Sequence, residues 1–286
     1  MRSVGRIAAA LIVTVAVGMA ASPAWAEDDE SDGDETALSA PSESDENDDS
    51  SPWPLLAGSK DADYPLLSYN DYPELTRLLL FSGTDLWRNG GYAHGGMLWS
   101  PNGFRDDGPV VKLLFSGGVY QYRSGALGNI NVIGRQFSGS LLPGWRFSRN
   151  GFVVTAYAGY DFQDHRLFPD DPSASRRGGY SGVRAALELW YQPNASTMFA
   201  ADASISSAGR SYSVRAAPGW RVANWFYLGP EFQAFAAGDN YRQYRAGAHM
   251  TGLRVGEIEW NAGLGWAFDS DDRNGPYGKL GVITRH

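Results

Sequence analysis

The chain has 286 residues, with 24 Lys and Arg against 32 Asp and Glu, a formal net charge of −8 and no Cys. The lack of Cys excludes a disulfide framework and a lipid-anchoring cysteine. The acidity is local, because residues 27–50 hold twelve carboxylates and no Lys or Arg, whereas 22 basic and 20 acidic residues follow. The near-neutral remainder excludes a charge-based argument for a nucleic-acid partner.

The first 26 residues have the pattern of an export signal. Arg2 and Arg6 precede an apolar run over residues 7–21, and small residues flank Trp25 just before Glu27. This pattern predicts a signal peptide over residues 1–26 that is removed in the mature protein. The alternative is an uncleaved membrane anchor, but the apolar run is shorter than the roughly 20 residues that a spanning helix needs.

Two further segments precede the patterned part of the chain. Residues 27–50 combine their carboxylates with Ser, Gly and Pro, so we predict a disordered acidic segment. A solvated linker is favoured for it over a cation-binding or partner-binding tail. Residues 51–73 contain four Pro and no sustained period, and they are predicted to be a periplasmic lead-in.

Alternation of apolar and polar residues dominates the rest of the chain. From Ile258 to Asp269, apolar residues that include Trp260 and Trp266 occupy every second position, and the intervening positions are mostly polar or small. The same period recurs over residues 152–163 and 183–191. Successive strand side chains point to opposite faces, so each such strand has one apolar face about ten residues long. Lipid on one side and water on the other produce this pattern.

We therefore predict an all-β fold for residues 74–286, an antiparallel transmembrane β-barrel of about twelve strands. The predicted strands are 75–87, 91–100, 109–122, 129–146, 151–163, 179–191, 195–207, 210–222, 224–237, 241–254, 257–269 and 276–285. Asn-Gly pairs such as Asn150-Gly151 and Asn274-Gly275 punctuate them, since tight hairpins need positive φ. A secreted water-soluble β-protein is the alternative, but its strands usually run to only five or six residues.

The lengths of the connections predict an orientation. An even number of strands places both chain ends on one side, which we take as the periplasm of a Gram-negative bacterium. The turns on that side are short except for residues 101–108, whereas the opposite side includes the long segment 164–178. Short periplasmic turns and longer external loops are typical of outer-membrane barrels.

If the apolar faces contact lipid, the polar faces line a lumen. The predicted lumen residues are Tyr157, Asp161, Arg184, Glu188, Trp190, Asp202, Arg215, Glu231, Arg245, His249 and Glu259. Their charges nearly balance, which suits a neutral polymer, and aromatic rings could stack on sugar faces. The same charges could instead pair and plug a narrow barrel, because buried ions need partners. The sequence leaves a conduit and a plug equally open.

Several strand segments resemble one known family. These segments are residues 80–85, 188–191, 227–231 and 241–249, and through them the region 75–286 resembles the cellulose biosynthesis protein BcsS family of alphaproteobacteria. The resemblance implies an outer-membrane protein that acts in secretion or surface organisation of cellulose or a related exopolysaccharide. It implies outer-membrane lipid, the glycan and the cellulose synthase system as partners. It supplies no catalytic residues.

Two other functions stay open at this stage. One is a structural or adhesive barrel whose outer loop, residues 164–178, contacts finished polymer. The other is an outer-membrane lipid hydrolase that would use His165, beside Asp164 in that loop. No nucleophile elbow or metal-ligand spacing frames this His, so we expect no enzymatic activity, cofactor or metal.

Overall fold

The computed structural model describes residues 76–286, apart from residues 175, 239–240 and 272. The predicted signal peptide, acidic segment and lead-in all lie outside the described residues. The strands are β1 (Leu78–Trp87), β2 (Gly90–Trp99), β3 (Gly108–Ser124), β4 (Ile130–Arg149), β5 (Phe152–Phe168), β6 (Gly178–Asn194), β7 (Thr197–Ser206), β8 (Ser211–Val222), β9 (Phe226–Ala237), β10 (Tyr241–Val255), β11 (Ile258–Asp269) and β12 (Asn274–Arg285).

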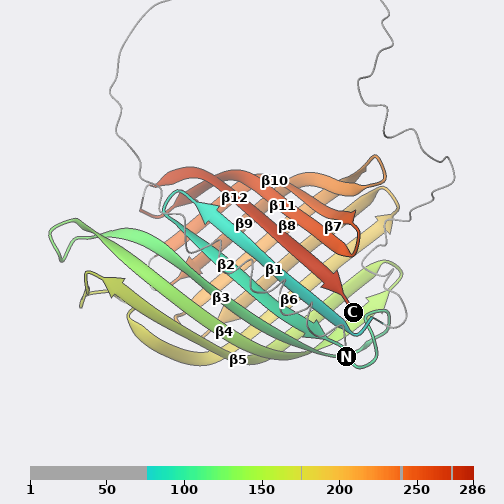
Figure 1. The fold of residues 1–286 in the computed structure, drawn as a ribbon, viewed down its shortest axis with the longest axis horizontal. Helices are drawn as coiled ribbons and strands as arrows, with labels where there is room; N and C mark the ends of the chain where they lie inside the picture. The colour runs from blue at the N-terminus through green and yellow to red at the C-terminus, as the bar shows by residue number, and fades with distance from the viewer. Residues whose placement is uncertain (1–75, 175, 239–240, 272) are drawn as a thin grey trace, which may run out of the picture. The chain divides into compact units, whose positions relative to one another are not determined.

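The strands form one closed antiparallel barrel (Figure 1). Each strand pairs with its neighbours in chain order, and β12 pairs with β1 from Leu79↔Arg285 to Trp87↔Tyr277. Closure leaves no strand edge unpaired. The predicted all-β, twelve-strand antiparallel barrel is therefore confirmed.

The two faces of the barrel wall differ as the alternation predicted. Large apolar side chains such as Leu264, Tyr160 and Phe232 are exposed on the outside, and Leu264 is 69% accessible. Asp161 and Glu231 are 0% accessible inside. A water-soluble protein has the opposite distribution, so the wall is built to face lipid. Within the part of the chain that the structure describes, no helix is long and apolar enough to cross a bilayer.

The ends of the barrel differ in their connections. We call the end that holds the start of β1 and the end of β12 the terminal rim, and the opposite end the loop rim. The terminal rim has short turns such as residues 150–151, where Asn150 and Gly151 take φ of 46° and 79°. The exception is residues 100–107, between β2 and β3. The contrast in length agrees with the predicted one, while the side of the membrane that each rim faces stays a prediction.

Two predicted boundaries were wrong. The long loop is residues 169–177 and not 164–178, because β5 continues to Phe168 by pairing with β4 and β6. Asn274-Gly275 is not a turn, since both residues begin β12 and pair with Phe268 and Ala267. In both cases the neighbouring strands supply hydrogen-bond partners that local turn propensity does not foresee.

Tyrosines inside the barrel lie on glycines of the next strand. Tyr120 of β3 pairs with Gly134 of β4, and a Cβ on Gly134 would lie 2.2 Å from Cζ of the Tyr120 ring. Tyr92 covers Gly118 in the same way, with a ring atom 2.6 Å from the Cβ position. Glycine is required at these positions because the ring occupies the space of a side chain.

We expect Gly134→Ala to destabilise the barrel by about 1–3 kcal/mol, because the added methyl group forces the Tyr120 ring out of its place. Unfolding of the detergent-solubilised protein, followed by heat-dependent gel mobility and tryptophan fluorescence, measures this effect. Gly117→Ala is the control, since its Cβ would meet no atom closer than 3.6 Å. Equal stability of the two variants would contradict this packing.

Candidate functional site

The loop rim encloses a cavity of about 750 Å³. This volume lies within the range of small-ligand sites. The lining combines aromatic rings, hydroxyls, amides and a few charges from many strands. Members used below are Asp85, Trp87, Tyr92, Ser116, Tyr120, Gln136, Ser138, Arg176, Tyr241 and Arg245. We call this space the loop-rim cavity.

An aromatic pair forms one side of the loop-rim cavity. Trp87 at the end of β1 and Tyr92 near the start of β2 stack with centroids 5.4 Å apart and planes 7° from parallel. The Tyr92 hydroxyl donates to Oε1 of Gln136 at 2.8 Å, and the Arg245 guanidinium lies 5.1 Å from the Trp87 ring centre. These contacts hold both rings in fixed orientations.

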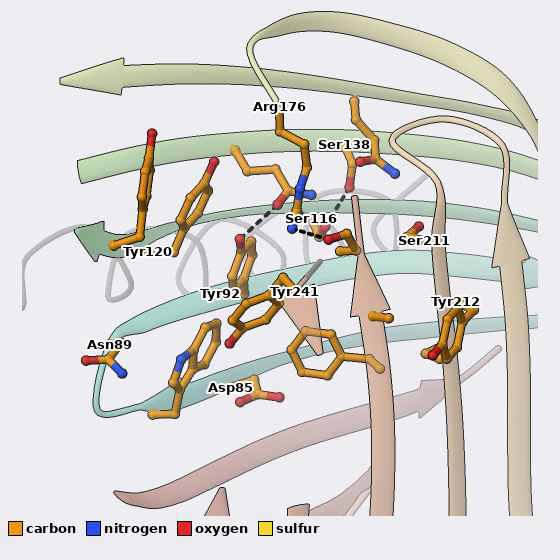
Figure 2. A pocket seen from close by; sticks show the side chains of 18 of the residues that line it. Asp85, Asn89, Tyr92, Ser116, Tyr120, Ser138, Arg176, Ser211, Tyr212 and Tyr241 are labelled. Carbon is orange, nitrogen blue, oxygen red and sulfur yellow. Dashed lines mark hydrogen bonds between the residues drawn. The ribbon is translucent and has the colours of Figure 1, made fainter. Parts of the chain in front are cut away.

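Polar groups lie next to this aromatic pair in the lining. The hydroxyls of Ser116 and Ser138 are 2.7 Å apart, and Arg176 donates from Nη2 to the carbonyl oxygen of Ala237 at 2.6 Å. Figure 2 shows Arg176 reaching toward Tyr92 and Ser116 from the connection between β5 and β6. Rings and hydrogen-bonding groups therefore converge on the same space.

The connection 169–177 is tied to the barrel by Asp171. Its Oδ1 accepts from the Ser173 hydroxyl at 2.6 Å, and its Oδ2 accepts from the Tyr122 hydroxyl at 3.0 Å. Hydrogen bonds from Ser124 and Ser173 lower the pKa of Asp171 to about 2. The carboxylate is thus ionised at neutral pH and fixes the segment that carries Arg176.

Ion pairs inside the barrel join strands that are not neighbours. Lys112 of β3 pairs with Glu188 of β6, and Arg245 of β10 pairs with Asp85 of β1 at 2.7 Å. In each pair two other strands lie between the partners in the barrel order, so these side chains reach across part of the interior. A third pair of this kind joins Lys279 of β12 to Glu231 of β9. We call these three contacts the crossing ion pairs.

A second cavity of about 610 Å³ lies on the terminal-rim side and shares five lining residues with the first, Asp85, His94, Leu114, Arg184 and Ser204. Beside it, an apolar cluster lies inside the barrel. Phe104, from the connection 100–107, is 1% accessible and clusters with Leu79, Leu98, Val110, Leu142 and Tyr157. The one long connection of the terminal rim thus folds inward and carries an apolar side chain into the barrel.

Seven of the predicted lumen residues contact one another in three groups. Tyr157 and Glu188 meet, with the Tyr157 hydroxyl donating to Oε2 of Glu188 at 3.0 Å. Asp161 pairs with Arg184 at 3.2 Å. Arg215 lies between Glu231 at 2.7 Å and Asp202 at 3.5 Å.

The other predicted residues do not join these groups. Trp190 stacks edge-on against Tyr227 at 6.2 Å, and His249 contacts the carbonyl oxygen of Pro218 at 2.9 Å. Glu259 pairs with Arg254 and Arg285 near the terminal rim. Arg245, as described, contacts Asp85 and Trp87.

Sequence reasoning missed several residues of the lumen. Asp85, Trp87 and Tyr92 lie on either side of the first hairpin turn. Asp85 and Trp87 share one face of β1, but that face has too few polar residues for the alternation to mark it as a lumen face. Lys112 is a single charge within the apolar stretch of β3, and that isolation is the signal that could have marked it. Phe104 is buried although it belongs to a connection, and local pattern gives no sign of this.

The hydrolase hypothesis placed His165 in an outer loop, and this placement was wrong. His165 lies within β5 and is 1% accessible. Its ring nitrogens lie 3.2 Å from the Tyr120 hydroxyl and 3.5 Å from Oε1 of Gln163. These contacts fix the orientation of the His165 ring within the barrel. Among the described residues, no group of three or more His, Cys, Asp or Glu is placed to hold a metal ion.

Solved structures share the barrel fold at low identity. The KdgM porin is 9% identical, with 72% of this chain and 98% of that chain covered and a TM-score of 0.41. A mutant of the TodX monoaromatic hydrocarbon channel is 9% identical, with 77% and 91% covered and a TM-score of 0.48. The translocator domain of the autotransporter NalP from Neisseria meningitidis is 11% identical, with 76% and 91% covered and a TM-score of 0.40.

No curated protein sequence matches this chain significantly. A family model does match, and it covers residues 79–286, which is nearly all of the described barrel. The description of that model is cellulose biosynthesis protein BcsS. The resemblance seen in the strand segments is thereby confirmed, and the chain belongs to the cellulose biosynthesis protein BcsS family.

Proposed function

We propose that this protein binds a stretch of a cellulose-type glycan in the loop-rim cavity and organises the polymer at the cell surface, without passing the chain through its lumen. The observation that carries this proposal is the combination of the Trp87–Tyr92 pair, a polar wall and a floor of crossing ion pairs. Family membership supplies the connection to cellulose.

The chemistry of the loop-rim cavity suits a neutral glucan. The faces of a glucose ring present C–H groups that pack on aromatic rings, and its hydroxyls both donate and accept hydrogen bonds. Trp87 and Tyr92 supply the rings, while Gln136, Ser116 and Ser138 supply polar partners. Most of the charges that line the cavity are paired, Arg245 with Asp85, Arg184 with Asp161 and Arg273 with Asp271, which favours a neutral solute.

The crossing ion pairs support retention over conduction. A polymer that threaded the barrel would have to separate Arg245 from Asp85 and Lys112 from Glu188. Separating the two side chains of a buried ion pair leaves each charge uncompensated, which costs several kcal/mol. Binding at the loop rim requires no such separation. A conduit for the glycan is the alternative, and it requires an open lumen.

We expect Trp87→Leu and Tyr92→Leu each to weaken binding of cellohexaose by about tenfold or more, because each loses a planar stacking surface. Isothermal titration of the detergent-solubilised barrel measures this loss. Tyr244→Leu is the matched control, since this ring is 56% accessible on the outer face of β10. Surface-retained cellulose in a strain carrying each variant is the second measurement.

The proposal fails if the wild-type barrel does not bind cellohexaose, or if both cavity variants bind it as tightly as the control. Unchanged surface cellulose in a strain that lacks the gene would remove the cellular role as well. Exposed loop residues would then be the place to test for adhesion, by shortening residues 169–177.

A further inference from the structure

The outer face of the barrel carries a row of arginines at the loop rim. Arg135 of β4 and Arg166 of β5 are directly opposite each other, and both are exposed. Arg177 directly precedes Gly178, which pairs with His165, so it continues the row toward β6. We call Arg135, Arg166 and Arg177 the arginine row.

The positions of these side chains follow from strand parity. On β4 the odd-numbered residues Phe137, Leu141 and Trp145 are exposed, and Arg135 continues that face. On β5 the even-numbered residues Phe152 and Tyr160 are exposed, and Arg166 continues that face. The arginine row therefore points away from the lumen and has no part in the loop-rim cavity.

The height of the arginine row matches the edge of a membrane. On the outer face of β4 the stretch without a charge runs from Phe147 to Phe137, and its ten residue steps at about 3.3 Å with a tilt of about 40° cover about 25 Å. That is the thickness of the apolar band of an outer-membrane barrel. Arg135 is the first charged residue on this face after Phe137, and the exposed Ile133 follows it. This height corresponds to the level expected for lipid headgroups.

The charges of the arginine row are only partly compensated. Asp164 pairs with Arg166 at 3.1 Å, and Asp170 pairs with Arg177. Within the described residues no carboxylate pairs with Arg135, whose guanidinium lies 5.4 Å from the Phe168 ring centre. Like charges directly opposite each other on neighbouring strands are destabilising. An anion between Arg135 and Arg166 would remove that repulsion.

We propose that the arginine row binds the phosphate groups of lipopolysaccharide in the outer leaflet. Guanidinium groups bind phosphate with paired, charge-assisted hydrogen bonds, and long arginine side chains reach headgroups from an apolar surface. Phe137 and Phe162 below the row, and Ile133 and Phe168 on its loop-rim side, supply apolar contact for acyl chains and sugar faces. The row thus meets both the charged and the apolar parts of one glycolipid.

Native mass spectrometry of the detergent-solubilised barrel with added lipid tests this proposal. We expect wild-type protein to retain diphosphoryl lipid A at least about tenfold more tightly than the same lipid without its phosphates. The double variant R135Q/R166Q should lose that preference. R149Q is the matched control, because Arg149 is on the outer face of the same strand at the terminal rim and is 74% accessible.

Thermal unfolding separates a lipid effect from a folding defect. Without lipid, R135Q/R166Q should be about as stable as wild type, because the like-charge pair is gone and the exposed Arg166–Asp164 ion pair that is also lost contributes little. Added diphosphoryl lipid A should raise the unfolding temperature of wild type and R149Q but not of the double variant. Equal retention of dephosphorylated lipid A, equal retention of phosphatidylglycerol, or retained preference in R135Q/R166Q would each overturn the proposal.

Discussion

Glu231→Gln is expected to lower the free energy of unfolding by about 3–5 kcal/mol, the largest single-residue effect that we predict for this barrel. Glu231 is 0% accessible and pairs with two cations, Arg215 at 2.7 Å and Lys279 across the lumen. Its other oxygen accepts from Gln233 at 2.7 Å. A neutral amide at this position leaves Lys279 without its counter-charge and leaves Arg215 with only its longer ion pair to Asp202 at 3.5 Å. Urea unfolding in detergent, followed by fluorescence and gel mobility, measures the loss.

Two further variants test whether the loss of stability comes from the buried charges. Glu257→Gln should change stability by less than about 0.5 kcal/mol, because Glu257 is exposed in a turn at the terminal rim. Adding Lys279→Gln to Glu231→Gln should recover part of the loss, since one unpaired cation is then removed. If Glu231→Gln is as stable as Glu257→Gln, the charge network does not stabilise the barrel as described.

The second large effect that we predict concerns ion conductance through the barrel. We expect wild-type protein in a planar bilayer to show no stable porin-like current steps, because the crossing ion pairs and the Phe104 side chain occupy part of a narrow lumen. A variant in which Asp85, Arg245, Lys112 and Glu188 are all changed to Ala should produce clear steps. Both partners of each pair are removed together, so no buried charge is left unpaired.

An ion pair at the surface of the barrel serves as the control for removing charges without opening the lumen. Arg149 and Asp107 form an ion pair of 2.7 Å at the terminal rim, and their replacement by Ala should leave the bilayer current at baseline. Heat-dependent gel mobility shows whether each variant is folded before it is tested. Stable porin-like steps from the wild-type protein would reject retention at the loop rim and favour export through the lumen.

The strands could be predicted because each has an apolar outer face and a more polar inner face. Residues 241–254 were predicted and β10 spans Tyr241–Val255, so period two alone located this strand to within one residue. The prediction for β5 stopped at residue 163, five residues before its end. The missing part contains His165 and Arg166, which read as loop residues in isolation, but β4 and β6 provide backbone partners there.

The candidate site could be predicted only in part. Alternation indicates which residues share a face, but it does not indicate which strands face one another across a closed barrel. Lys112 and Glu188 are 76 residues apart in the chain, and nothing local connects them. The burial of Phe104 likewise depends on the width of the lumen and on the residues that line it, and the unusual length of its connection was the only sign.

The seam between β1 and β12 has a consequence for biogenesis. The first and last strands hydrogen-bond to each other, and the amide groups of Arg77 and Leu78 both donate to the carbonyl oxygen of His286. The cylinder can therefore seal only after β12 has been synthesised and has met β1. A premature stop before Asn274 would expose backbone on β1 and β11 to hydrocarbon, where water cannot compensate it. Such a truncated product should be a target for periplasmic proteolysis.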